Sequence, residues 1–350
     1  MNSASRLLQW YDRVRRDLPW RRTRDPYAIW VSEIMLQQTR VETVIPYYMA
    51  FLDRFPTVED LAKAPEEDVL ARWSGLGYYR RARQLHAAAK KVVELGSFPK
   101  TSSGWLELPG IGPYTSAAIA SIAFGEVIPV LDGNVERFLC RRLAWAEDPK
   151  RAAVRRQLLD VAAELLDPRR PGDSNQALME LGATICRPKQ PTCESCPLAE
   201  DCRGRQEGDV ERFPRPRRRR PTEKVILVVA VVQEGDRILF FRRPKEAELM
   251  PGMWELPNVR QQEERSETEQ ALGERYGGKW TLGKKVRRVR HQITFRALTL
   301  EVHTAEVKMG DFVAQGLEGR WISEAERKDY GMSSIVEKVF REKVFEKKAL

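Results

Sequence analysis

Four of the five cysteines in this 350-residue chain fall within seventeen residues, and this cluster restricts the possible folds more than any other feature. They are Cys186, Cys193, Cys196 and Cys202, in the spacing C-x6-C-x2-C-x5-C. In a chain expected to be cytoplasmic, such density indicates metal binding rather than disulfides. Four thiolates can hold a zinc ion or a [4Fe–4S] cluster. Zinc sites more often present two short C-x2-C pairs, so the wide outer spacings favour the cluster. Cys140 reads as an ordinary buried thiol.

The chain changes character on either side of a basic, proline-containing segment, residues 205–224. Residues 1–204, which include the cysteine loop 186–202, read as almost entirely helical, with glycine and proline turns. Residues 225–350 carry β-branched strand patterns and two helical stretches, which predicts a separate α+β domain. The segment itself has eight basic and four acidic residues. Its prolines and like charges predict an extended linker.

The charge balance points to a polyanionic partner. Sixty lysines and arginines against fifty aspartates and glutamates give a net charge of +10. Such an excess favours nucleic acid, although an ordinary basic enzyme remains open on charge alone. No stretch approaches the 18 or so apolar residues of a membrane span, and the N-terminus lacks the apolar core of a secretory signal. We expect no membrane partner and a cytoplasmic location, nucleoid-associated if the source is bacterial.

A glycine turn between two helical stretches is a candidate anion site. It reads LPGIGPYT over residues 108–115. Glycines let the backbone approach a ligand, and amides at the start of a helix donate to anions. Phosphate is the natural occupant, which makes Gly110, Gly112 and Thr115 candidate contacts to a DNA backbone. Helix packing also uses such turns. Asp132 opens a later helix from the turn LDGN and is well placed to face a cleft.

Together these features resemble the helix–hairpin–helix DNA glycosylase superfamily with its iron–sulfur loop, and within it the MutY-type adenine DNA glycosylases. The resemblance implies an all-α helix–hairpin–helix domain with a [4Fe–4S] loop, followed by an α+β Nudix-like domain. The stretches that carry it are LPWR (18–21), WVSEIMLQQT (30–39), GLGYY (75–79), LDGNV (131–135), NQA (175–177) and GMWELP (252–257).

The family resemblance implies a base-excision-repair enzyme. Its substrate would be double-stranded DNA with adenine opposite 8-oxoguanine or guanine. The enzyme would flip the adenine out of the stack and hydrolyse its N-glycosidic bond, leaving an abasic site. We expect it to act as a monomer, because one chain supplies both halves needed to surround a duplex.

The resemblance also implies the catalytic residues. Glu33 would be the general acid that protonates the adenine at N7, and its apolar helix neighbours should raise its pKa. Asp132 would stabilise or transiently bond the sugar cation. Tyr114 stands where bifunctional relatives carry a Schiff-base lysine, so the enzyme should lack lyase activity. Tyr114 and Asn134 would orient Asp132 or the attacking water. The plainer alternatives are a surface glutamate for Glu33 and a helix cap for Asp132.

Further residues match the family's substrate contacts. Arg21 and Gln176 would read the adenine edge, since a glutamine amide can pair bidentately with adenine. Trp20 and Trp30 would be pocket walls, although core packing is the usual role of tryptophan. An apolar or planar wedge fills the hole that a flipped base leaves. The residues matching the wedge and the contacts to the estranged guanine are Gln38, Thr39, Leu76 and Tyr78.

The C-terminal domain is implied to recognise 8-oxoguanine. A Nudix hydrolase needs an R-E-x-x-E-E helix for its metal, and EQALGERY at 269–276 lacks most of those ligands. The domain should therefore bind rather than hydrolyse. Many relatives carry a Phe-Ser-His loop where this chain has Ile293, Thr294 and Phe295. Ile293 could stack and Thr294 keeps a hydroxyl, but the imidazole is lost, so the strength of the preference for 8-oxoguanine stays open. Alternatively, these residues merely end a strand.

Three other functions remain weaker alternatives. An endonuclease III-like glycosylase and lyase acting on oxidised pyrimidines is disfavoured by Tyr114 and by the second domain. A non-catalytic iron–sulfur DNA-binding protein would not need both Glu33 and Asp132. A Nudix hydrolase as the main activity lacks its metal ligands.

Overall fold

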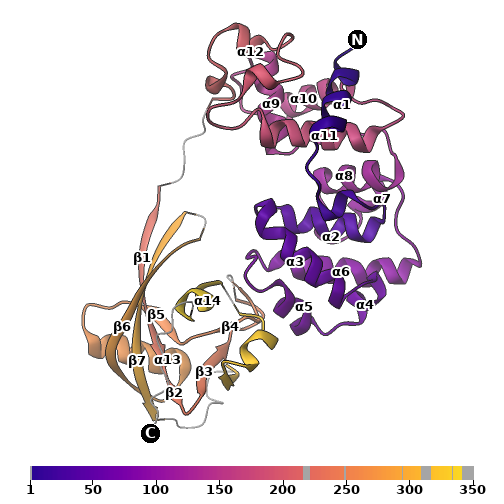
Figure 1. Ribbon diagram of the computed structural model, residues 1–350. Coiled ribbons are helices and arrows are strands. Elements are labelled where there is room, and N and C mark those ends of the chain that lie inside the picture. Colours follow the sequence, from indigo (N-terminus) through magenta and orange to yellow (C-terminus); the bar gives the residue numbers. More distant parts are fainter. Residues whose placement is uncertain are drawn as a thin grey trace. The chain divides into compact units, whose positions relative to one another are not determined.

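The chain forms two compact units, which are described separately below (Figure 1). The computed structural model describes residues 2–215, 221–247, 250–293, 295–308, 317–332 and 334–340. The first unit comprises residues 1–62 and 87–218, and the second comprises residues 63–86 and 219–350.

The first unit is helical throughout its described residues. The apolar helix α2 is buried over nearly its whole surface, as expected of a helix without a polar face. Helix α8 packs against both α2 and α11 (Figure 1). No described helix of the chain is long and apolar enough to cross a membrane. The helices are α1 (Ser3–Val14), η1 (Pro19–Arg21), α2 (Pro26–Leu36), α3 (Val41–Arg54), α4 (Val58–Lys63), α6 (Arg80–Leu95, shared with the second unit), α7 (Ser102–Leu106), α8 (Pro113–Phe124), α9 (Gly133–Leu143), α10 (Ala152–Glu164), α11 (Pro171–Thr184), η2 (Cys193–Ser195), α12 (Arg203–Gln206) and η3 (Val210–Arg212).

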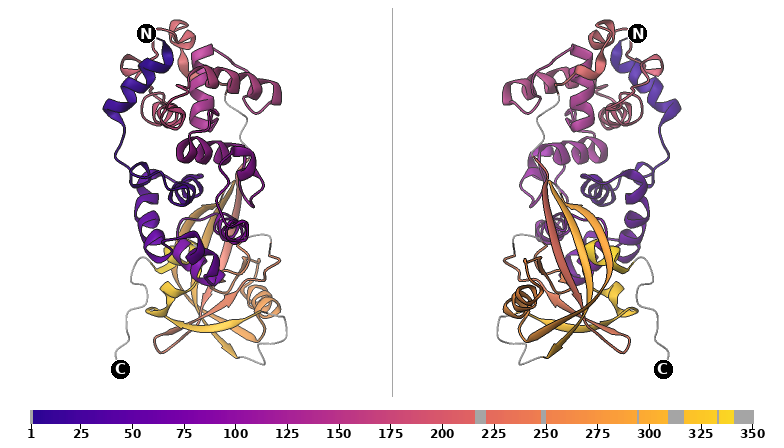
Figure 2. Two further views of the ribbon diagram at one scale, coloured as in Figure 1. Left: turned by 90° about the vertical axis from the view of Figure 1, so that its right-hand side faces the viewer. Right: turned by 90° about the vertical axis from the view of Figure 1, so that its left-hand side faces the viewer.

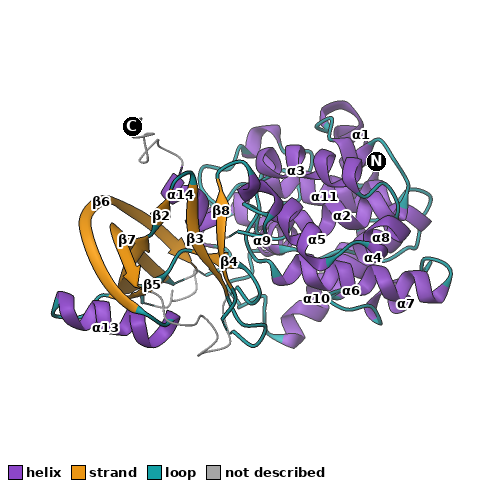
Figure 3. Cartoon of the chain, turned by 90° about the horizontal axis from the view of Figure 1, so that it is seen from below, coloured by secondary structure: helices purple, strands orange, loops and turns teal. Residues whose placement is uncertain are grey.

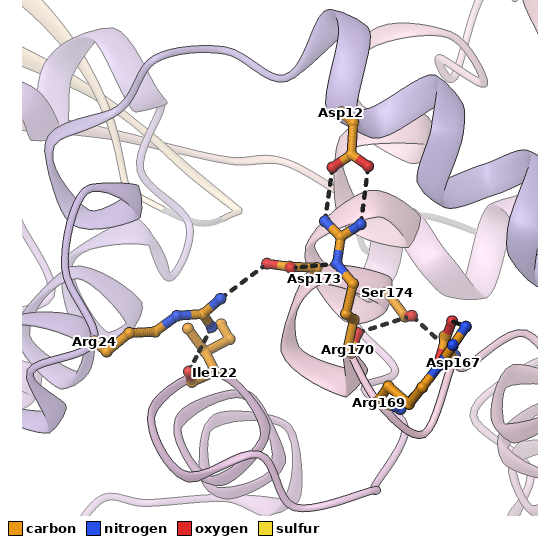
Figure 4. Close-up of polar contacts among 8 residues, drawn as sticks. All are labelled: Asp12, Arg24, Ile122, Asp167, Arg169, Arg170, Asp173 and Ser174. Atoms are coloured by element: carbon orange, nitrogen blue, oxygen red, sulfur yellow. Dashed lines mark hydrogen bonds and ion pairs between the residues drawn. The ribbon is translucent and has the colours of Figure 1, made fainter.

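Arginine–carboxylate pairs fix the N-terminal end of α11 (Figure 4). Arg170 donates to both carboxylate oxygens of Asp12 on α1, at 2.9 and 2.7 Å, and its Nε donates to Asp173 at 2.9 Å. Arg24, just before α2, donates to Asp173 at 3.2 Å and to the carbonyl of Ile122 on α8 at 2.7 Å. The network therefore joins α1, α8 and α11 to the loop that connects α1 with α2.

The prediction that residues 205–224 form an extended linker is wrong for their beginning. Helix α12 and the single turn η3 lie there. Phe213 is buried, and its carbonyl accepts a hydrogen bond from Nε of Arg141 at 3.2 Å. Burying this aromatic ring outweighs the tendency of the surrounding charges to keep the chain solvated. Residues 216–220 lie outside the described part.

The second unit combines helix α5 (Glu66–Trp73) with a mixed α+β fold. Its described strands form two four-stranded sheets, one with the order β5-β1-β7-β6, the other with β2-β3-β4 and β8 paired to β3. Strand β1 runs parallel to β7 and antiparallel to β5. Figure 3 shows all the described strands in this unit. The elements are β1 (Glu223–Val231), β2 (Gln233–Glu234), β3 (Arg237–Arg242), β4 (Trp254–Glu255), β5 (Asn258–Arg260), α13 (Arg265–Tyr276), β6 (Lys279–Ile293), β7 (Arg296–Lys308), β8 (Gly319–Ser323), η5 (Glu326–Asp329) and α14 (Ser334–Phe340).

Alternation along β1 places the two hydrophobic cores on opposite faces of the larger sheet. Val225 and Val229 join the cluster that includes α14, whereas Val228 joins the cluster that includes Leu272 and Tyr276 of α13. This is the two-residue period of a strand buried on both faces. Strands β1, β6 and β7 run side by side over much of their length (Figure 2).

Gly172 is a point of close approach between helices, which gives a first prediction. A Cβ atom there would lie 2.6 Å from the carbonyl oxygen of Ser121 and 2.7 Å from Cα of Ile122, so α11 touches α8 backbone to backbone. We expect Gly172→Ala to lower the free energy of unfolding by about 1–3 kcal/mol, as measured by urea denaturation. At the matched control Gly133→Ala a Cβ meets open space. Equal stability of the two variants would contradict this close packing.

Candidate active site

A cleft of about 720 Å³ in the first unit collects most of the predicted catalytic and base-contacting residues. Its size lies within the usual range of small-molecule pockets. Its walls come from η1, α2, α8, α11 and the start of α9. The predicted residues that line it are Trp20, Arg21, Glu33, Gln38, Thr39, Tyr114, Asp132, Asn134 and Gln176.

Glu33 is a buried carboxyl group on α2. It is 5% exposed, and the hydroxyl of Tyr114 donates a hydrogen bond to its Oε2 at 2.7 Å. Burial raises the pKa of Glu33 to about 7, with a further upward contribution from Asp132; the Tyr114 hydrogen bond and the charge of Arg21 act against it. A carboxyl group with this pKa can give up a proton near neutral pH.

Asp132 faces the same cleft and is also the N-cap of α9. Its Oδ1 accepts from the main-chain nitrogens of Asn134 at 2.9 Å and Val135 at 2.7 Å. Its Oδ2 accepts from the side-chain amide of Asn134 at 3.0 Å. Burial raises the pKa of Asp132, and these hydrogen bonds oppose the rise. Capping and placement in the cleft are thus both realised.

A chain of hydrogen bonds leads from Asp132 to the cysteine segment. Arg137 donates to the side-chain oxygen of Asn134 at 3.0 Å and to the carbonyl of Cys186 at 2.9 Å. It also donates to the carbonyl of Gly182 at 2.7 Å. A Cβ atom on Gly182 would lie 2.7 Å from Cβ of Asn134, so α11 presses directly on the start of α9. Sequence reasoning missed Arg137, since an arginine one helical turn along α9 looks solvent-facing.

Glu180 and Arg16 also line the cleft and were not predicted. Glu180 lies on α11, and its side chain is 1% exposed. It accepts hydrogen bonds from Arg16 and from Arg21, each at 2.8 Å. The signal that could have revealed it is a charge on a helix whose other positions are mostly buried.

The glycine turn has the backbone expected of it, but Thr115 differs. Gly110 has a φ of +77°, and Gly112 caps α8. The side chain of Thr115 is buried, and its hydroxyl accepts from the amide of Gln37 at 3.2 Å. The prediction that Thr115 faces a DNA backbone is therefore corrected for its side chain, which the apolar helix draws into the interior.

Trp30 does not line the cleft. It is fully buried, and its ring stands edge-on to Trp105, with centroids 5.5 Å apart. Its assignment as a pocket wall is corrected: this face of α2 points into the core. Trp20 does line the cleft, and its ring stands edge-on to Tyr48 at 5.4 Å.

Two of the four predicted wedge residues have strained backbones. Gln38 has a φ of +57° and Tyr78 one of +49°, which non-glycine residues rarely adopt. Gln38 and Thr39 line the cleft, whereas Leu76 and Tyr78 belong to the second unit. Leu76 is buried and Tyr78 is half exposed, with the guanidinium of Arg81 5.6 Å from its ring centroid.

The predicted 8-oxoguanine loop is the turn between β6 and β7. Ile293 ends β6, pairs with Arg296 and packs against the α14-side core, so it does not stand free as a stacking group. The guanidinium of Arg296 lies 5.2 Å from the ring centroid of Phe295. Thr294 lies outside the described residues.

The cysteines Cys186, Cys193, Cys196 and Cys202 line one small cavity, and all four are free thiols. No histidine, aspartate or glutamate shares this lining, so the donor set is purely thiol, as an iron–sulfur cluster requires. Among the described residues, no three ligand-type side chains are arranged to hold a single metal ion. The buried Arg141 organises the surrounding loop by donating to the carbonyls of Arg187 at 2.6 Å and Pro188 at 2.9 Å.

Comparisons with known proteins match both units. Residues 31–164 match the HhH-GPD superfamily of base excision DNA repair proteins, and residues 227–342 match the NUDIX domain. The adenine DNA glycosylase of Homo sapiens is 38% identical over 96% of this chain and 72% of its own length. That of Arabidopsis thaliana is 41% identical over 72% of this chain and 46% of its own length. The solved structure of a thermostable thymine-DNA glycosylase is 32% identical, covers 58% of this chain and 95% of its own, and superposes with a TM-score of 0.54.

The burial of Glu33 predicts a pH-dependent stability difference. Its pKa is raised from an ordinary 4.5 to about 7, so the folded wild type loses stability as the pH rises through this interval. Glutamine carries no charge. We therefore expect Glu33→Gln to gain stability over the wild type between about pH 4.5 and pH 8.5, by on the order of 3 kcal/mol. Urea unfolding of both proteins at the two pH values measures this. A constant difference would mean that Glu33 titrates normally.

Proposed function

Since this chain belongs to the adenine DNA glycosylases of base excision repair, we propose that it removes adenine opposite 8-oxoguanine or guanine without cutting the strand. As an adenine DNA glycosylase it hydrolyses N-glycosidic bonds, and its fold joins the helix–hairpin–helix domain to a Nudix-like domain, as predicted. We propose that it acts as a monomer on duplex DNA.

The observation that carries the proposal is the pair of carboxyl groups in one cleft. Glu33 keeps a proton near neutral pH and would pass it to N7 of the flipped adenine as the bond to the sugar breaks. Asp132 would face the positive charge that develops on the sugar. Asn134 holds Asp132 in place through two hydrogen bonds, and Tyr114 does the same for Glu33.

The absence of lyase activity is proposed from the chemistry of the cleft. A strand cut through a Schiff base needs an amine nucleophile. The residue beside Glu33 is Tyr114, whose phenol donates to that carboxyl group. None of the described residues that line the cleft is a lysine.

Recognition of both partners of the mispair would be divided between the units. Gln176 lines the cleft, and its amide could pair with the adenine edge. In the C-terminal unit, Glu269 of α13 is engaged by Arg265 at 3.1 Å and by the main-chain nitrogen of Leu282 at 2.8 Å, so it is not free for metal. We infer that this domain binds 8-oxoguanine near the turn at 293–295 and does not hydrolyse nucleotides.

We also propose that the four cysteines hold a [4Fe–4S] cluster. The cluster would supply a rigid anchor for a loop whose flanking residues are basic and could lie on DNA phosphates. Those flanking residues are Arg187, Lys189, Arg203 and Arg205.

A second candidate is removal of thymine opposite guanine. The 32% identity to a thymine-DNA glycosylase favours including it, although that structure corresponds to only 58% of this chain. Gln176, whose amide suits adenine, would have to accept a pyrimidine instead.

Single-turnover cleavage of labelled duplexes tests the substrate. The set contains adenine opposite 8-oxoguanine, guanine and thymine, thymine opposite guanine, and thymine glycol opposite adenine. We expect base loss from the first two, with breaks only after alkali. Glu33→Gln should lower this rate roughly 10²–10⁴-fold, and the exposed control Glu59→Gln should not change it. Breaks without alkali would contradict the monofunctional assignment, and thymine loss would favour the second candidate.

Iron analysis tests the cofactor. We expect about four iron atoms per chain in the wild type. Cys196→Ala should lose most of this iron, because it removes one of four thiolate ligands. The matched control is Cys140→Ala, since Cys140 is fully buried and lies outside the cysteine cavity; this variant should keep the wild-type iron content. Zinc in place of iron, or equal loss in both variants, would contradict the cluster assignment.

A further inference from the structure

Glu180 is an ionised carboxylate in the wall of the cleft, and the proposed chemistry gives it no role. A charge buried to this degree is tolerated only with close partners. Its Oε1 accepts from the main-chain nitrogen of Arg16 at 3.2 Å and from Nε at 2.8 Å. Its Oε2 accepts from Nη2 of Arg16 and from Nη2 of Arg21, both at 2.8 Å. Burial alone would raise the pKa of Glu180, but these hydrogen bonds outweigh it and lower the pKa to about 2.

These contacts leave Arg21 little freedom. One arm of its guanidinium donates to Glu180, and the other donates to the carbonyl of Arg16 at 3.1 Å. The guanidinium also lies 5.5 Å from the ring centroid of Tyr11. With 11% of its side chain exposed, Arg21 is held from three directions. Glu180 supplies the one negative charge among these contacts.

The position of Arg21 matters because its charge acts on Glu33. The groups that set the pKa of Glu33 are Tyr114 on α8, Asp132 at the start of α9 and Arg21 on η1. Arg21 lowers that pKa, whereas burial and Asp132 raise it. Apart from Glu180, the only carboxyl groups among the described cleft residues are Glu33 and Asp132. Without the charge of Glu180, Arg21 would be drawn towards one of these two.

We propose that Glu180 is a positioning residue that keeps Arg21 paired on the α11 side of the cleft and so leaves the proton on Glu33 available for the reaction. The proposal rests on the function inferred above, in which Glu33 is the general acid. It also explains why a carboxylate is buried beside two arginines in a cleft that must bind a neutral base.

The test is the pH dependence of single-turnover adenine release. In the wild type the rate should fall as the pH rises through about 7, where Glu33 loses its proton. In Glu180→Gln this alkaline limb should move to lower pH by roughly 1–3 units, because Arg21 is free to approach Glu33. At acidic pH the rate should return towards the wild-type value. A purely structural defect would lower the rate at every pH without moving the limb.

Two companion variants isolate the role of Arg21. Arg21→Gln removes the cation and should move the limb to higher pH, and adding Glu180→Gln to it should then move the limb little. The exposed control Glu164→Gln on α10 should leave the profile unchanged. Circular dichroism melts establish that each variant is folded.

The outcomes separate this inference from the proposed function. An active wild type whose limb stays in place in Glu180→Gln overturns the inference alone. A limb that still moves when Arg21 is already glutamine overturns it too. If Glu180→Gln does not fold, Arg21→Gln decides, since an unmoved limb there means that Arg21 does not act on Glu33. A wild type that releases no adenine overturns the proposed function.

Discussion

A carboxyl group taken out of water must either keep its proton or be given enough donors to stay ionised, and the helical unit depends on having both solutions a few ångströms apart. Glu33 receives one hydrogen bond, from a phenol, and burial holds its pKa near 7. Asp132 receives three, two of them from the backbone of the helix it opens. Glu180 receives two guanidinium groups. The graded supply of donors, rather than residue type, separates a proton donor from two anions.

The scaffold around these groups is arranged to keep that gradation fixed. Helix α2 can carry a glutamate in its centre because the rest of the helix is apolar and is packed on every side. The clamp around Arg170 ties α11 to α1 and to the segment before α2, on which Arg21 lies. The hydrogen-bonded path through Arg137 fixes the opposite wall to the cysteine loop. Each wall of the cleft is thus anchored outside it.

The sequence was informative where one residue's chemistry determines its surroundings. The turn LDGN predicts a capping aspartate, and the crowded cysteines predict a shared cavity, because these features are local. The pairing of Arg21 with Glu180 could not be predicted, since the two are 159 positions apart and meet only through packing. Trp30 and Thr115 were misplaced for a related reason: which face of an apolar helix meets the cleft is set by the neighbouring helices. The burial of Phe213 reversed the expected behaviour of a charged segment in the same way.

The contact between Gly182 and Asn134 bears on which inherited changes such an enzyme can survive. Every missense change at that codon adds at least a Cβ, which would meet the backbone and Cβ of Asn134 at under 3 Å. The displaced atoms belong to the group that aims Asp132, so damage would reach the reaction without any contact to DNA. In a repair enzyme, such an allele would be seen first as a raised mutation rate in its carrier, with the protein still folded and abundant.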